Sequence, residues 1–100
     1  MRYTIDVTIE AVQELHAVPA NRRATIAKAI EEQLVHEPTI VTRNRKPLPG
    51  VKPPFEHVPP IWELRVGEYR VFYDVITEEN LVSIRAIRHK TAGHTTEEIL

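Results

Sequence analysis

The stretch IWELRVGEYRVFYD, residues 61–74, alternates apolar and polar side chains on both sides of one glycine. Such alternation is typical of two antiparallel strands joined by a tight turn. Glycine at the first position of a two-residue loop favours a type II′ turn, so we expect Gly67 and Glu68 to form that loop. In this register Arg65 lies directly opposite Arg70. Like charges in that position destabilise a sheet, so the hairpin raises the question of which negative group balances them.

This register divides the strands into two faces. The apolar face, which we expect to pack on helices, carries Trp62, Leu64, Val66, Val71, Tyr73 and Val75, extended on the next strand by Val82, Ile84 and Ala86. The opposite face carries Glu63, Arg65, Arg70, Phe72, Asp74, Arg85, Ile87 and His89. Its basic bias allows two interpretations. It is either a solvated face, whose arginines pair with Glu63 or Glu68, or a phosphate or nucleic-acid site, where Phe72 stacks on a base.

Upstream of the hairpin, the chain predicts one strand and two helices. Residues 2–7 alternate in polarity and fit a short strand. Thr8 is suited to cap a helix that ends at Ala17. A second helix is expected over residues 21–36, because apolar residues recur there at the spacing of one helical face. The two helices form a hairpin with one apolar face to bury.

Residues 38–60 hold seven of the eight prolines and are expected to be an irregular connector. The connector includes a stretch without acidic residues, TRNRKPLPGVK, which carries Arg43, Arg45, Lys46 and Lys52. After the hairpin, a strand over residues 81–89 completes an antiparallel meander, with Arg88 and Lys90 at its end. The last residues, TTEEIL, predict a helical turn capped by a threonine.

We therefore expect a single domain over residues 1–100, of the α+β class. Its elements follow the order β-α-α-β-β-β, in a predominantly antiparallel sheet covered on one face by a helical hairpin, with a short C-terminal helix. The composition, 42% apolar and 27% charged, is that of a soluble globular protein. No apolar run approaches the roughly 18 residues of a spanning helix, and the N-terminus lacks a signal-peptide pattern, so we expect no membrane partner and a cytoplasmic location.

The residues present exclude several kinds of chemistry. The chain has no cysteine, which excludes disulfides and thiol catalysis. Its five histidines show no metal-ligand spacing and it has no glycine-rich phosphate loop, so we expect neither a metal nor a cofactor. The formal net charge is −1, so nucleic-acid binding has to rest on a local basic patch.

The string WELRVGEYRVFYDV, followed by IRAIRHK, resembles the RelE/ParE superfamily, the toxins of type II toxin–antitoxin systems. The preceding TRNRKPLPG is similar to the segment before the first hairpin strand of that family, and the expected order of elements agrees over nearly the whole chain. The resemblance implies a toxin that is silenced by a cognate antitoxin protein. RelE-like members are metal-independent endoribonucleases that cut mRNA on the ribosome and so inhibit translation, whereas ParE-like members inhibit DNA gyrase.

The resemblance also implies roles for particular residues. Arg70 matches the arginine of the family's Tyr-Arg pair, which holds the reacting phosphate, and Arg65 lies where RelE has a lysine. Lys90 aligns with an arginine at the end of RelE's last strand, and His89 aligns with the histidine of the YoeB branch. We therefore expect the catalytic residues to be Arg65, Arg70, His89 and Lys90. The residues expected to bind RNA or phosphate are Arg43, Arg45, Lys46, Lys52, Phe72, Arg85 and Arg88.

The chain also departs from both branches. Glu63 stands where RelE has a lysine, Lys46 stands where YoeB has an acidic residue, and RelE's late tyrosine has no counterpart. Because neither branch's catalytic set is complete, the function stays open between an mRNA endoribonuclease, a gyrase inhibitor and a non-toxic protein that only binds its antitoxin. His89 has an alternative role as well, as an edge histidine paired with Glu68.

Overall fold

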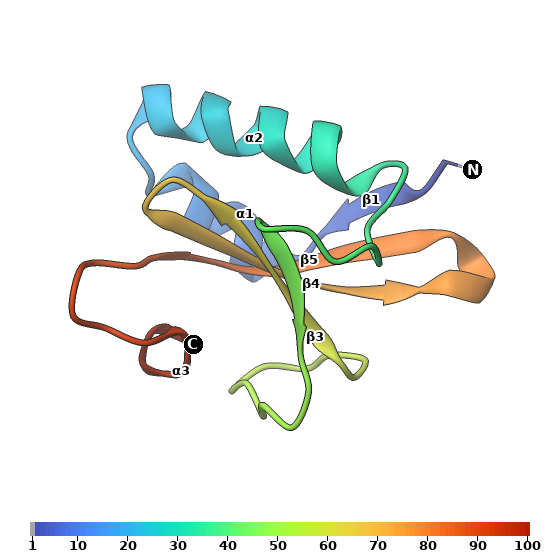
Figure 1. The fold of residues 1–100 in the computed structure, drawn as a ribbon. Helices are drawn as coiled ribbons and strands as arrows, with labels where there is room; N and C mark the ends of the chain where they lie inside the picture. Colours follow the sequence, from blue (N-terminus) through green and yellow to red (C-terminus); the bar gives the residue numbers. More distant parts are fainter. Residues whose placement is uncertain (1) are drawn as a thin grey trace.

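The computed structural model describes residues 2–100, which form a five-stranded sheet with helices against it (Figure 1). The elements are β1 (Thr4–Val7), α1 (Ile9–His16), α2 (Ala20–Leu34), β2 (Arg45–Leu48), β3 (Ile61–Val66), β4 (Tyr69–Ile76), a 3-10 turn η1 (Thr77–Glu79), β5 (Leu81–His89) and α3 (Thr96–Ile99). The strand order is β1-β5-β4-β3-β2. Only β1 and β5 run parallel; the other neighbours are antiparallel. This arrangement confirms the predicted α+β class.

The expectation that residues 38–60 are irregular throughout is wrong, because β2 lies within them. This strand pairs antiparallel with β3 and forms one edge of the sheet. An edge strand tolerates Pro47, which has no N–H group to donate to a neighbour. Alternation along β2 sends Arg45 and Lys46 to opposite faces of the sheet.

The predicted hairpin register is confirmed. Val66 pairs with Tyr69 and Arg65 pairs with Arg70, so two residues form the loop between β3 and β4. Gly67 has a φ of +58°, as the first position of a type II′ turn requires. The local signals of alternation and glycine were therefore sufficient to fix the centre of the fold.

The strand β5 departs at one point from the strict alternation that the sequence predicted. Ile84 lies opposite Tyr73 and Ala86 lies opposite Phe72, so Arg85 is the extra residue of a β-bulge. From Ala86 onward, each residue of β5 therefore lies on the face opposite to the one that strict alternation predicts. The expectation that Ala86 faces the helices while Ile87 and His89 face away is therefore wrong for all three.

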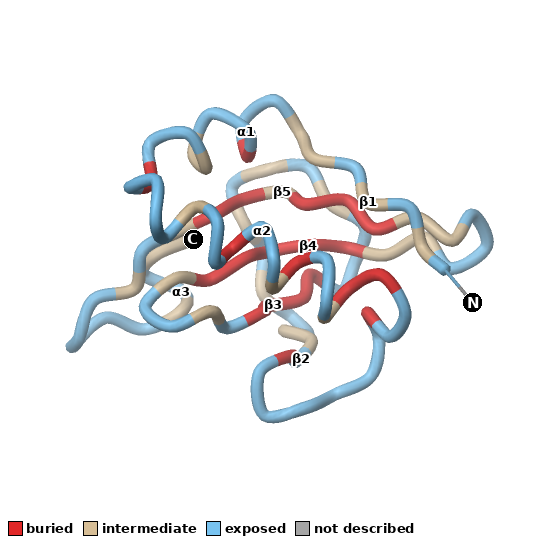
Figure 2. The backbone as a smooth tube through the Cα atoms, turned by 90° about the horizontal axis from the view of Figure 1, so that it is seen from above, coloured by how far each residue is buried: buried red, intermediate tan, exposed pale blue. Residues whose placement is uncertain are grey.

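The main core lies between the helices and the sheet. Figure 2 shows buried residues along the centres of β3, β4 and β5, and in the main core they meet the apolar side of α2. Its members include Ile26, Ile30 and Leu34 of α2, with Trp62, Leu64, Val71, Tyr73, Val82, Ile84 and Ile87 of the sheet. No helix in residues 2–100 is long and apolar enough to cross a membrane.

A second, smaller cluster lies on the opposite face of the sheet. Phe72, Ile61 and Ala86 are buried there. Residues of the connector and of the C-terminal end, such as Phe55 and Leu100, pack over them, on the side where Figure 1 shows α3. The tail therefore covers part of the face that carries the arginines.

The buried Tyr73 hydroxyl gives a first test of the packing. It donates a hydrogen bond of 2.6 Å to the carbonyl of Pro38, and burial raises the pKa of Tyr73 above its ordinary value. We expect Tyr73→Phe to lower the free energy of unfolding by about 1–3 kcal/mol, because the carbonyl loses its donor. Urea denaturation measures the change. The matched control is Tyr3→Phe, at a half-buried residue whose hydroxyl makes no hydrogen bond within residues 2–100. Equal losses in both variants would contradict the prediction.

The start of α3 gives a second test. Its N-cap is Thr95, and a reciprocal pair of hydrogen bonds joins Thr95 to Glu98. The backbone N–H of Thr95, and then its side chain, hold the pKa of the Glu98 carboxyl below its ordinary value. A depressed pKa means that the stabilisation is present above the unfolded value of about 4.3 and is lost as the pH falls through the folded one.

We therefore expect α3 to fray in acid, with the Thr95 amide signal in NMR spectra losing its folded position at a pH below the ordinary pKa of a glutamate. Glu98→Gln should remove this pH dependence, because its amide cannot ionise. Glu97→Gln, at an exposed neighbour, should retain it. An identical acid transition in Glu98→Gln would show that another group controls α3.

Candidate phosphate-binding site

A row of three arginines crosses the face opposite the helices. Arg65 of β3 pairs with Arg70 of β4, which pairs in turn with Arg88 of β5. The backbone N–H of Arg65 donates to the carbonyl of Asn44 at 2.8 Å, on the β2 side. Arg65 and Arg70 therefore form a non-hydrogen-bonded pair, the kind in which opposite side chains approach most closely.

Arg70 is held in a fixed position. Its side chain is 9% exposed, and its Nη1 donates to the carbonyls of Gly67 and Tyr69, both at 2.9 Å. Burial lowers the pKa of Arg70, Glu63 opposes this change, and the neighbouring Arg65 lowers the pKa further. A guanidinium has five N–H donors, so the two bonds from Nη1 leave the Nε and Nη2 groups. That edge suits two oxygens of one anion.

The other two arginines of the row differ in their freedom. Arg88 forms an ion pair with Glu14 of α1, and its Nε donates to the carbonyl of Ile99 at 2.9 Å. It is therefore neutralised and ties the C-terminal end to the sheet. Arg65 is exposed, and its side chain makes no hydrogen bond or ion pair within residues 2–100. Of the row, Arg65 and Arg70 remain available to a ligand.

A hollow of about 230 Å³ lies over these two arginines, lined by Arg43, Asn44, Lys46, Glu63, Arg65, Arg70, Lys90 and Thr96. We call it the arginine pocket. It gathers five cationic side chains and one acidic side chain, although the whole chain has a net charge of −1. Such a local excess of positive charge attracts anions.

The single acid of the arginine pocket is Glu63, whose side chain is 6% exposed. Its Oε2 accepts a hydrogen bond of 2.7 Å from the hydroxyl of Thr96. Longer separations of 4.0 Å join Oε2 to Nε of Arg70 and Oε1 to Nζ of Lys46. The sequence also allowed Glu63 to pair with an arginine of this face. In the structure this pairing is only a loose ion pair.

Among the residues predicted to be functional, the arginine pocket contains Arg43, Lys46, Arg65, Arg70 and Lys90. His89 lies elsewhere, because the bulge turns it to the face of the helices. Its ring packs at a tilt against Tyr69, with centroids 4.9 Å apart, and its Nε2 lies 3.3 Å from Oε2 of Glu68. The alternative placement, an edge histidine paired with Glu68, is the one observed.

Besides Arg88, four residues predicted to bind RNA lie outside the arginine pocket. Arg45 is 5% exposed and donates to the carbonyl of Gln33, so it belongs to the helical side. Phe72 is fully buried and cannot stack on a base, which corrects the expectation that it is exposed. Arg85 binds the buried carboxylate of Asp74 at 3.0 Å. Lys52 is exposed in the connector beyond β2.

Sequence reasoning missed two members of the arginine pocket, Asn44 and Thr96. Asn44 lies within the basic stretch TRNRK, of which only the basic residues were singled out from the sequence. Thr96 belongs to a tail that is distant in the sequence, and no local pattern indicates that the tail folds back over the sheet.

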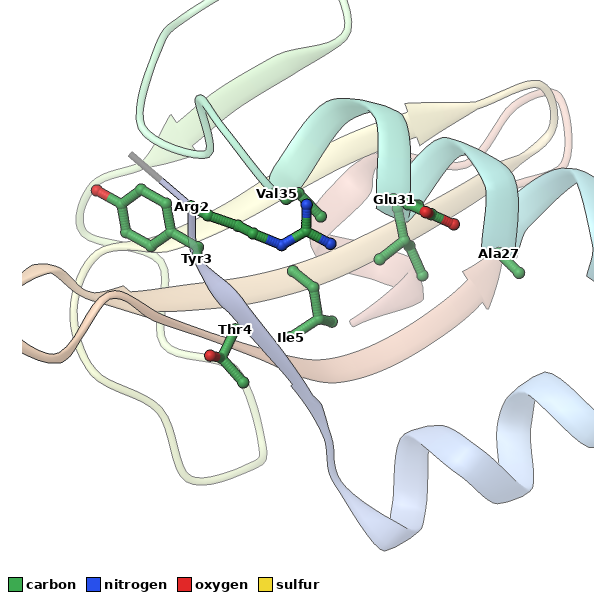
Figure 3. Close-up of a pocket in the computed structure, with 8 residues that line it drawn as sticks. Arg2, Tyr3, Thr4, Ile5, Ala27, Glu31 and Val35 are labelled. Carbon is green, nitrogen blue, oxygen red and sulfur yellow. The ribbon is translucent and has the colours of Figure 1, made fainter.

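A larger groove of about 510 Å³ lies between β1 and α2 (Figure 3). Its charged side chains are Arg2 and Glu31, of opposite sign, and Figure 3 shows Arg2 extending toward α2. Despite its smaller volume, the arginine pocket is the better anion site, because five of its six charged side chains are cationic.

Comparison with known proteins bears on the fold and the family of the chain. The family model "ParE toxin of type II toxin-antitoxin system, parDE" matches residues 5–92. The curated proteins contain no match. Among solved structures, the chain is similar to the toxin–antitoxin complex RelBE2 from Mycobacterium tuberculosis, with 27% identity over 90% of this chain and 100% of that chain, at a TM-score of 0.71.

Two other structures share the fold. The archaeal RelE–RelB complex from Pyrococcus horikoshii OT3 is 19% identical over 93% of this chain and 100% of that chain, at a TM-score of 0.72. The isolated E. coli RelE toxin is 16% identical over 92% of this chain and 88% of that chain, at a TM-score of 0.54. The resemblance inferred from the hairpin is thereby confirmed. Since the family model covers most of the chain, this protein belongs to the ParE toxin family of type II toxin–antitoxin systems, within the RelE/ParE superfamily.

Proposed function

We propose that this toxin is a RelE-type endoribonuclease that cuts mRNA on the ribosome and thereby inhibits translation. The observation that carries the proposal is the arginine pocket, in which five cations and one acid surround a hollow of about 230 Å³. A volume of this order admits one phosphate group of an RNA chain. Strand pairing holds Arg65 and Arg70 side by side over it.

The arginine pocket supports the chemistry of phosphodiester cleavage. The reaction develops negative charge on the phosphoryl oxygens, and fixed donors aimed at that charge lower the barrier. The Nε and Nη2 edge of Arg70, which makes no hydrogen bond within residues 2–100, suits two of these oxygens, and Arg65 adds a second guanidinium. Lys90 lines the same hollow and supplies an ammonium group for the leaving oxygen. His89, on the far face, takes no part in this scheme.

A cognate antitoxin and a cytoplasmic site of action belong to the same proposal. The similar structures from Mycobacterium tuberculosis and Pyrococcus horikoshii are complexes of a toxin with its antitoxin. By that likeness we expect a small antitoxin protein to bind this chain. The charge of the arginine pocket favours acidic side chains on the segment that covers it.

A second candidate is inhibition of DNA gyrase. The match to a family model that carries the ParE name favours it. In that case the arginines serve as a binding surface, and no RNA bond is broken.

Expression of single variants separates the candidates. We expect the wild-type protein to stop growth and to leave cleaved mRNA. Arg65→Ala and Arg70→Ala should lower the cleavage rate by about 10²- to 10³-fold each, because each removes a donor to the phosphoryl oxygens. The control is Arg22→Ala, which removes an equal charge from the exposed side of α2 and should retain toxicity. Cleavage is measured by mapping mRNA ends in cells and on purified translating ribosomes.

Two outcomes contradict the ribonuclease proposal. Growth arrest with intact mRNA and inhibited gyrase would support the second candidate. Harmless expression of the wild-type protein would indicate a family member that only binds its antitoxin.

A further inference from the structure

The hydrogen bond between Thr96 and Glu63 places a hydroxyl group inside the arginine pocket. The Thr96 Oγ1 lies 2.7 Å from Oε2 of Glu63, and the same Oε2 lies 4.0 Å from Nε of Arg70. A hydroxyl donor, a carboxylate acceptor and the Nε–Nη2 edge of Arg70 thus adjoin one another in the hollow.

The two cations nearest Glu63 form only loose ion pairs with it. A direct N–H···O bond requires about 2.7–3.2 Å between the heavy atoms, so neither Arg70 nor Lys46, each at 4.0 Å, hydrogen-bonds to the carboxylate. The hydroxyl of Thr96 is the only hydrogen-bond donor to Glu63 within residues 2–100. The carboxylate is therefore arranged to accept a hydroxyl group.

This arrangement matches the chemistry of a ribonucleotide. An ionised carboxylate only accepts hydrogen bonds, so it repels a second phosphate oxygen and favours a donor. In RNA, the 2′-hydroxyl stands on the carbon next to the one that bears the 3′-phosphate. The 2′-hydroxyl is also the group by which proteins distinguish RNA from DNA.

We propose that Glu63 accepts the ribose 2′-hydroxyl of the RNA at the position that the Thr96 hydroxyl holds in this structure, and that it removes the proton of that hydroxyl during cleavage. The inference rests on the proposed function. It assigns to this toxin an acidic catalytic residue where RelE has a lysine.

The step balances in atoms and charge. The 2′-oxygen forms a bond to phosphorus while the bond from phosphorus to the 5′-oxygen breaks. The proton of the 2′-hydroxyl passes to Oε2 of Glu63, and the 5′-oxygen takes a proton from the ammonium group of Lys90. The products are a 2′,3′-cyclic phosphate and a 5′-hydroxyl end, and nothing is oxidised or reduced.

Binding tests the hydroxyl contact without any cleavage. The probes are a fluorescent RNA hexanucleotide and its 2′-deoxy counterpart of the same sequence, compared by anisotropy. We expect the wild-type protein to bind the RNA probe about tenfold more tightly, as a hydrogen bond to a charged group allows. Glu63→Ala should abolish this preference, whereas Glu63→Gln should keep a reduced one, because an amide oxygen still accepts.

Two further variants sharpen this test. Thr96→Val should increase the affinity for the RNA probe alone, because it removes the competing hydroxyl. The control is Glu79→Gln in η1, an exposed acid outside the arginine pocket, which should retain the wild-type preference. Equal affinities of the wild-type protein for the two probes, or an unchanged preference in Glu63→Ala, would overturn the hydroxyl contact.

Cleavage on translating ribosomes tests the proton transfer. Glu63→Gln should lower kcat by about 10²-fold or more, because an amide takes up no proton. Its KM should stay equal or fall, because one negative charge leaves the site. A merely structural role would instead raise KM or lower the thermal stability. Wild-type kcat in Glu63→Gln would overturn the proton transfer.

The two assays also separate this inference from the proposed function. Absence of cleavage by the wild-type protein would overturn both the proposed function and the proton transfer. The preference for ribose would then still decide whether Glu63 accepts a hydroxyl.

Discussion

The β-bulge at Arg85 is the constraint on which the site depends. By adding one residue to β5, it lets Ile84 and Ile87 both pack into the main core although they are three positions apart. The same shift brings Arg88 into the row with Arg70 and carries His89 to the side of the helices. Without the bulge, Ile87 would lie opposite Arg70, His89 would share the face of the arginines, and Arg88 would lie on the face of the helices.

The row of like charges is tolerated because two of its members have partners and the third is exposed to solvent. Arg88 is neutralised by Glu14, and the Nη1 of Arg70 is occupied by two backbone carbonyls. Arg65 is exposed, where solvent screens its charge. The structure thus answers the question raised by the hairpin. The protein balances Arg88 fully and Arg70 partly, and it leaves Arg65 and the Nε–Nη2 edge of Arg70 for an anion.

Features that depend on residues close together in the chain could be predicted from the sequence, whereas features that depend on contacts between distant segments could not. The hairpin depends on neighbours in the chain, so alternation and Gly67 were enough to fix its register. The strand β2 and the folded-back tail depend on contacts between distant segments, which no local pattern records. The bulge did leave a signal, since the apolar residues Val82, Ile84 and Ile87 are spaced by two and then by three.

The candidate site likewise has features that the sequence predicted and features that depend on long-range contacts. The pair Arg65 and Arg70 followed from the register, whereas Phe72 was misjudged because the covering tail was not foreseen. The acid at Glu63 was visible as a departure from RelE, but its role could not be derived until Thr96 was placed against it. Burial and long-range hydrogen bonds therefore decide which charges of a basic patch remain available.

The central claim is that Arg65 and Arg70, and not the other arginines of the sheet, hold an RNA phosphate. NMR observation of the arginine Nε–H signals during titration with an RNA dinucleotide tests it directly. The signals of Arg65 and Arg70 should shift together, while those of Arg85 and Arg88 should stay in place, because their Nε groups already donate to Asp74 and Ile99. Shifts confined to Arg85 and Arg88, or none at all, would contradict the account.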